Sequence, residues 1–155
     1  MQITYKSSTI FVSNIASSRW FYETVLGLVP TIDANNYVAY EGGVAIWLQS
    51  IAGEAIHGEP YVGDLGSNNF ELYFETEHLD MAWKKMEEIG VKVHSKVEEH
   101  PWGQRSFRLY DPDDYIVEIG ESMGSVVIRL NKSMSVEEIS KKTYLSKEAI
   151  SNYLK

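Results

Sequence analysis

Hydrophobic and polar positions along the chain follow two spacings, which predict alternating strands and helices. Apolar residues alternate with polar ones over residues 3–12, and a spacing of two is typical of a strand. Over residues 16–26 the apolar positions recur at helical spacing instead, and Gly27 stands where a helix commonly ends. Three short strands are expected next, at about 28–33, 36–41 and 44–50.

Residues 51–67 break this order, and after them the order returns. The segment is aperiodic and rich in glycine, so we interpret it as a mobile loop. A strand is expected after it at 69–76, followed by a helix at 79–89 that Gly90 ends. The remaining strands are expected at about 91–98, 105–110 and 115–120, with Asp111-Pro112-Asp113-Asp114 as the turn between the last two.

The chain therefore follows the order strand, helix and three strands, twice over. This repetition predicts an internally duplicated α+β domain over residues 1–121, with modules at about 1–50 and 68–121. Such a duplication usually places a cleft between its two halves, and a cleft of this kind is a common place for a small-molecule site.

The strand at 69–76 has one acidic side. Glu71, Tyr73 and Glu75 share that side, while Leu72 and Phe74 share the other and are expected to pack in a core. The acidic side could face water, or it could line a cavity in which a carboxylate binds a metal ion or a basic ligand. Glu75, near the end of the strand, is expected to face water.

Residues 122–155 extend beyond the two modules and are expected to form helices. The segment SMGSVVIRLNKS predicts a short first helix. Ser135, with Glu138 as its capping-box partner, is expected to begin a second helix, and Ser146 a third. An apolar seam on these helices is expected from Ile139, Leu145, Ile150 and Leu154.

The last two of these helices have the spacing of a helix-turn-helix unit. We do not expect nucleic acid as a partner, because the second of them carries only Lys147 and Lys155 as cations and the usual additional helix is not evident. We expect this C-terminal extension to cover the cleft, to form a dimer interface or to bind another partner.

The composition narrows the class of protein. The 155 residues suit one domain or two joined halves, and a hydrophobic fraction of 44% is enough for a core. A net charge of -8 repels nucleic acid and anionic membranes. The lack of cysteine excludes disulfides and thiolate catalysis. Without a membrane-length apolar run or the apolar core of a signal peptide, we expect a soluble cytoplasmic protein.

Two stretches of the chain resemble a known superfamily. FVSNIASSRWFYETVLGL resembles the opening strand and helix, and RSFRLYDPDDYIVEI the final hairpin, of the vicinal oxygen chelate superfamily. That superfamily contains glyoxalase I, bleomycin-resistance proteins and extradiol dioxygenases. The resemblance covers about residues 3–120. It implies two βαβββ modules whose curved sheets enclose a cleft, and it favours a homodimer.

The resemblance also implies four positions for metal ligands, namely Ser7, Trp47, Glu71 and Glu118. Serine is a poor neutral ligand and tryptophan is none, so only the two glutamates are convincing donors. We therefore expect no complete metal site and no resident cofactor. The alternative is a divalent Ni, Zn, Fe or Mn ion held by Glu71 and Glu118 together with another donor.

The remaining candidate residues line the same expected cleft. Arg105 could anchor a carboxylate or phosphate of a ligand, or it could simply neutralise Glu71 or Glu118. Trp47 and Tyr73 are expected to face inward and Trp102 to lie at the mouth, as ligand contacts or, alternatively, as core. His100 could act as an acid, a base or a third metal ligand, and Glu118 is the candidate general base.

Three functions follow from these residues. The first is a glyoxalase/bleomycin-resistance-like protein that binds a small molecule in an aromatic, acidic cleft without a complete metal site. The second is a metal-dependent lyase, isomerase or dioxygenase that uses Glu71 and Glu118. The third is a ligand-sensing regulator that acts through the C-terminal helices.

Overall fold

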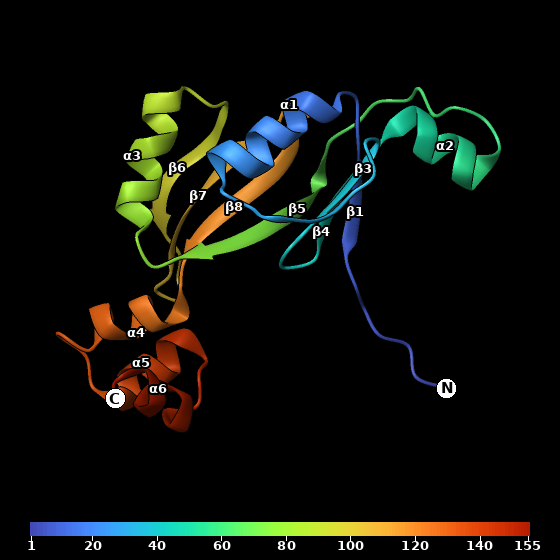
Figure 1. The fold of residues 1–155 in the computed structure, drawn as a ribbon. Helices are drawn as coiled ribbons and strands as arrows, with labels where there is room; N and C mark the ends of the chain where they lie inside the picture. The colour runs from blue at the N-terminus through green and yellow to red at the C-terminus, as the bar shows by residue number, and fades with distance from the viewer. The chain divides into compact units, whose positions relative to one another are not determined.

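The computed structural model describes residues 1–155, which form two compact units. The first unit holds residues 1–68 together with 111–115, and the second holds residues 69–110 together with 116–155. Each repeat of the chain supplies one four-stranded sheet, and the elements follow one another as labelled in Figure 1. None of the helices combines the length and the apolar character that a membrane span requires.

The first sheet is a mixed sheet with the strand order β1-β4-β3-β2. Its strands are β1 (Ser8–Val12), β2 (Pro30–Asp33), β3 (Tyr37–Tyr40) and β4 (Val44–Leu48). β1 lies parallel to β4, and the other neighbours are antiparallel. The helix predicted at 16–26 is present, as α1 (Ile15–Arg19) continued by the π-helix η1 (Trp20–Val25). The strand predicted at 3–12 is shorter than expected.

The loop predicted over residues 51–67 is wrong in its first part, because α2 (Gln49–His57) occupies it. Alanine, glutamine and glutamate in this segment favour a helix. Ala52 and Gly53 are buried within it. A Cβ atom on Gly53 would lie 2.1 Å from the backbone nitrogen of Tyr61, so this glycine allows close packing and does not mark flexible chain.

The second repeat has the same arrangement as the first. It contains β5 (Ser67–Thr76), α3 (Leu79–Ile89), β6 (Val93–Glu99), β7 (Arg105–Tyr110) and β8 (Tyr115–Glu121). The strand order is β5-β8-β7-β6, which repeats the order of the first sheet. The predicted pair of βαβββ modules in an α+β fold is therefore confirmed.

The two sides of the second sheet differ in character. Leu72, Phe107, Leu109, Val117 and Ile119 are buried on the side that α3 covers, where Trp83 meets Phe107 with ring centroids 5.2 Å apart. Because side chains alternate along strands, their neighbours lie on the opposite side. We call this opposite side the polar face, and it consists of Glu71, Tyr73, Glu98, Ser106, Arg108, Glu118 and Gly120.

The C-terminal extension folds into three helices, labelled in Figure 1, and their buried side chains form a core of their own. They are α4 (Met123–Leu130), α5 (Val136–Thr143) and α6 (Lys147–Tyr153). The predicted capping box at Ser135 and Glu138 is present, and Ser146 caps α6 as predicted. The buried residues of this core are Val126, Val127, Leu130, Ile139 and Ile150. A third helix, α4, thus joins the two that the sequence grouped together.

The turn after β7 contains a buried carboxyl group in the first unit. Tyr22 donates a hydrogen bond of 2.8 Å from its hydroxyl to Asp111, which is 3% exposed. The backbone N–H groups of Asp113 and Tyr115 also donate to Asp111, each at 2.9 Å. Burial nevertheless dominates these hydrogen bonds and raises the pKa of Asp111 from 3.8 to about 6.

This raised pKa predicts a stability change between pH 7 and pH 4. An acid whose pKa is higher in the folded state binds more protons when folded, so its contribution grows as the pH falls. The wild type should therefore gain about 2–3 kcal/mol relative to Asp111→Asn over that range, measured by urea unfolding at several pH values. A difference between the two proteins that stays flat from pH 7 to pH 4 would contradict this.

Candidate functional site

Arg108 of β7 lies on the polar face, and its guanidinium group contacts carboxylates from three other strands. Its Nε donates a hydrogen bond of 3.0 Å to Glu71 of β5, and its Nη2 donates to Glu118 of β8. Arg108 and Glu118 are directly paired across the antiparallel strands β7 and β8. A third carboxylate, that of Glu98 in β6, lies 3.7 Å from Nη1. One guanidinium group thus serves carboxylates from three strands.

Burial makes this charge pairing important. The side chain of Glu118 is only 5% exposed and that of Arg108 only 20%, whereas that of Glu71 is 41% exposed. Burial opposes the charged form of Arg108, but the hydrogen bond to Glu71 and the nearby carboxylate charges raise its pKa above the ordinary value. The buried carboxylate of Glu118 therefore has a permanent cation beside it.

Arg105, the cation that the sequence offered for Glu71 or Glu118, binds neither of them. It donates hydrogen bonds to Glu121 from Nε at 3.0 Å and from Nη2 at 2.8 Å, and it also contacts Asp80 in α3. Arg105 has the same strand parity as Phe107, so it lies on the side of the sheet that α3 covers. Of the two alternatives for Arg105, the one in which it neutralises Glu71 or Glu118 is thus wrong.

Sequence reasoning missed Arg108, although the sequence contains a sign of it. In RSFRLY the apolar residues Phe107 and Leu109 mark the side that faces the core. A charged residue between them must point to the other side of the sheet, which is the side of Glu118. Strand alternation alone therefore distinguishes Arg108 from Arg105.

An aromatic platform lies beside the acidic group. The rings of His100 and Trp102 are stacked, with centroids 4.4 Å apart and an interplanar angle of 10°. His100 Nε2 is 2.7 Å from the hydroxyl of Ser106 and 3.9 Å from the carboxylate of Glu118. Trp102 is 37% exposed. His100 thus lies between an accessible indole and the buried carboxylate.

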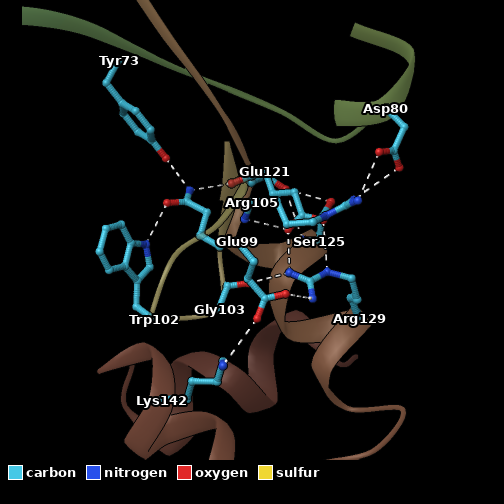
Figure 2. A network of polar contacts seen from close by, with 12 residues as sticks. Tyr73, Asp80, Glu99, Trp102, Gly103, Arg105, Glu121, Ser125, Arg129 and Lys142 are labelled. Atoms are coloured by element: carbon cyan, nitrogen blue, oxygen red, sulfur yellow. Dashed lines mark hydrogen bonds and ion pairs between the residues drawn. The ribbon is translucent and has the colours of Figure 1, made fainter. Parts of the chain in front are cut away.

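The buried side chain of Gln104 forms hydrogen bonds with two of the predicted aromatic residues, Tyr73 and Trp102, which are labelled in Figure 2. It accepts a hydrogen bond of 3.1 Å from Trp102 Nε1 and donates one of 2.6 Å to the hydroxyl of Tyr73. Tyr73 is 48% exposed, so it is less enclosed than the sequence predicted; partial burial, together with the hydrogen bond to Glu75, raises its pKa to about 12. Gly120 allows this approach, because a Cβ there would lie 3.0 Å from Gln104 and 3.1 Å from the Tyr73 ring.

The C-terminal helices are bound to the loop that carries Trp102. Figure 2 shows Arg129 of α4 pointing toward Glu121 and Gly103. Arg129 donates a hydrogen bond of 2.7 Å to the buried carboxylate of Glu121 and another to the carbonyl oxygen of Gly103. Lys142 of α5 pairs with Glu99 at 3.4 Å. Gly103 has a φ of +86°, a backbone conformation that favours glycine.

The four ligand positions that the resemblance implies do not fit a resident metal ion. Trp47, in β4 of the first unit, packs edge-to-face with Phe11 and Tyr37 at centroid distances of 6.4 and 5.8 Å. Ser7 precedes β1. In the second unit Glu71 and Glu118 are both bound to Arg108. The structure contains no group of three or more His, Asp or Glu side chains arranged to hold a metal ion.

The structure thus brings five of the predicted site residues into the second unit. Glu71, Glu118 and Tyr73 belong to the polar face, and Trp102 adjoins it through His100 and Gln104. Arg105 lies on the other side of the sheet, and Trp47 belongs to the first unit. Glu75 is exposed, as predicted.

Comparisons with known proteins agree with this fold. The family model described as Glyoxalase-like domain matches residues 5–124. The chain is similar to a structure of a protein of unknown function from Agrobacterium tumefaciens, with 34% identity and a TM-score of 0.74, covering 79% of this chain and 96% of that one. A comparison with curated proteins found no match.

More distant structures share the fold. One similar structure is that of a member of the glyoxalase/bleomycin resistance protein/dioxygenase superfamily from Sphaerobacter thermophilus. It is 26% identical to this chain, with a TM-score of 0.61, and the match covers 78% of this chain and 98% of that one. The structure of a lactoylglutathione lyase from Agrobacterium tumefaciens is 18% identical, with a TM-score of 0.60, and the match covers 77% of this chain and 93% of that one. The chain belongs to the glyoxalase-like family of the vicinal oxygen chelate superfamily.

Proposed function

We propose that the polar face, together with Trp102, binds a small planar molecule that carries a positive charge, without a resident metal ion. The observation that carries this proposal is the position of His100, whose ring stacks on Trp102 while its Nε2 lies 3.9 Å from the carboxylate of Glu118. An exposed aromatic surface and an acidic group are therefore adjacent, as a planar cation requires.

The charges of the polar face support a cationic ligand. Glu71, Glu98 and Glu118 surround Arg108, so the carboxylates outnumber the guanidinium group. The superfamily name of one similar structure includes bleomycin resistance proteins as well as enzymes. A binding protein is therefore one of the classes that this superfamily contains. Fold similarity does not specify the ligand, so the proposal rests on the residues of the site.

A matched pair of dyes tests the sign of the ligand charge. Acridine orange is a planar cation and anilinonaphthalene sulfonate is an aromatic anion. Titrations followed by dye fluorescence, on protein treated with a chelator and then dialysed, should give tighter binding of the cation. Preference for the anion, or cation binding only after a divalent metal is restored, would overturn the proposal.

Trp102→Leu is expected to weaken acridine orange binding about tenfold. An aromatic stack contributes on the order of 1–3 kcal/mol, and leucine removes the flat ring while keeping an apolar side chain. Trp20→Leu is the matched control, because Trp20 is also exposed, at 48%, but lies in the first unit. An equal loss in both variants would show that the dye binds exposed tryptophan in general.

A further inference from the structure

Three carboxylates surround the guanidinium group of Arg108, and each one contacts a different nitrogen atom. Glu71, Glu98 and Glu118 come from β5, β6 and β8, and each has an oxygen within 3.7 Å of a guanidinium nitrogen. The side chain of Glu118 is 5% exposed, so its charge needs a close positive partner. Arg108 supplies that partner from β7, the strand between β6 and β8.

Such an oxygen-rich arrangement is also what a hard divalent cation requires. Carboxylate oxygens are the preferred ligands of Mg²⁺, Ca²⁺ and Mn²⁺. The guanidinium group and a metal ion cannot both lie between these carboxylates, because they would share the same oxygens and repel each other. With Arg108 in place, no group of three acidic or histidine side chains is arranged to hold a metal ion.

We propose that Arg108 takes the place of a divalent cation on the polar face. Removing its side chain creates a carboxylate site for Mn²⁺ from Glu71, Glu98 and Glu118, with His100 as a neighbouring donor. Arg108 is thus a built-in cation that excludes metal from the face. This inference does not depend on which ligand the face binds, so it can fail or hold independently of the proposed function.

The test is a Mn²⁺ titration followed by electron paramagnetic resonance, in which bound Mn²⁺ loses the sharp signal of the free ion. Arg108→Ala should bind one Mn²⁺ per chain at least about tenfold more tightly than the wild type. Adding Glu118→Gln to Arg108→Ala should weaken that binding at least about tenfold again. Arg105→Ala is the control and should behave as the wild type does, because Arg129 still pairs with Glu121.

Two results would overturn the proposal. One is Arg108→Ala binding Mn²⁺ no more tightly than the wild type, and the other is tight binding that Glu118→Gln leaves unchanged. Arg108→Ala that folds only when Mn²⁺ is added would support it. If Arg108→Ala does not fold under either condition, Arg108→Gln, which is neutral and longer than alanine, undergoes the same titration, and no gain in affinity there overturns the proposal.

Discussion

Replacing Glu121 with glutamine is expected to lower the free energy of unfolding by about 3–5 kcal/mol, because it breaks a buried charge network. The side chain of Glu121 is 5% exposed. It accepts hydrogen bonds from Arg105 at 2.8 Å and from Arg129 at 2.7 Å. Glutamine has nearly the same shape but no charge, so both arginines would lose their shared partner. Urea unfolding of the two proteins at pH 7 measures the difference.

Glu137→Gln is the matched control for this experiment. Glu137 also pairs with two cations, Lys141 and Lys147, but its side chain is 59% exposed. Exposed ion pairs contribute little, so this variant should unfold almost as the wild type does. Equal losses from Glu121→Gln and Glu137→Gln would contradict the importance of burial at Glu121.

The same network predicts the effect of acid. Burial would raise the pKa of Glu121, but hydrogen bonds from Arg129 and Arg105 outweigh burial and lower it from 4.5. Since the folded-state pKa is the lower one, the stabilisation is fully present above about pH 4.5 and is lost as the pH falls through the lowered value. Asp111 acts in the opposite direction, because its folded-state pKa is raised.

Phe107→Ala is the second substitution with a large expected effect, about 3–5 kcal/mol. Phe107 is fully buried and packs against Trp83 of α3. Alanine would leave a cavity under β7, the strand that carries Ser106 and Arg108 on its polar side. The melting temperature should therefore fall, and acridine orange should bind more weakly than to the wild type.

Phe70→Ala is the control for the cavity, because Phe70 is 40% exposed. Its loss should cost less than about 1 kcal/mol, since surface substitutions seldom remove packed contacts. If Phe107→Ala were no more destabilising than Phe70→Ala, the side of the sheet under α3 would not be the core described above.

The sequence predicts the elements of this fold well where two local features agree. The helix predicted at 79–89 has the same bounds as the observed α3, because apolar spacing and Gly90 both mark it. The prediction failed at α2, where Gly53 suggested a loop although the residues around it favour a helix. Whether a glycine is buried against another segment, here Tyr61, depends on tertiary contacts that local spacing does not contain.

The candidate site could be predicted only in part for a related reason. Glu71, Tyr73 and Glu118 lie on the polar face because strand alternation fixes the side to which each points. The partner of each carboxylate depends on the pairing between strands, which decides that Arg108 faces Glu118 and that Arg105 reaches Glu121. The contribution of α4, through Arg129, depends on how the C-terminal helices fold back, which no motif indicates.

The hydrogen bond from Arg129 to the carbonyl oxygen of Gly103 has a thermodynamic consequence. Trp102 and Gly103 are neighbours in one short loop. The hydrogen bond from Arg129 orders this loop, so a molecule that stacks on Trp102 would lose less conformational entropy on binding. By linkage, a molecule that stacks on Trp102 would protect the amide hydrogens of α4 from exchange. By the same reciprocity, the C-terminal helices would contribute to the affinity for such a molecule without touching it.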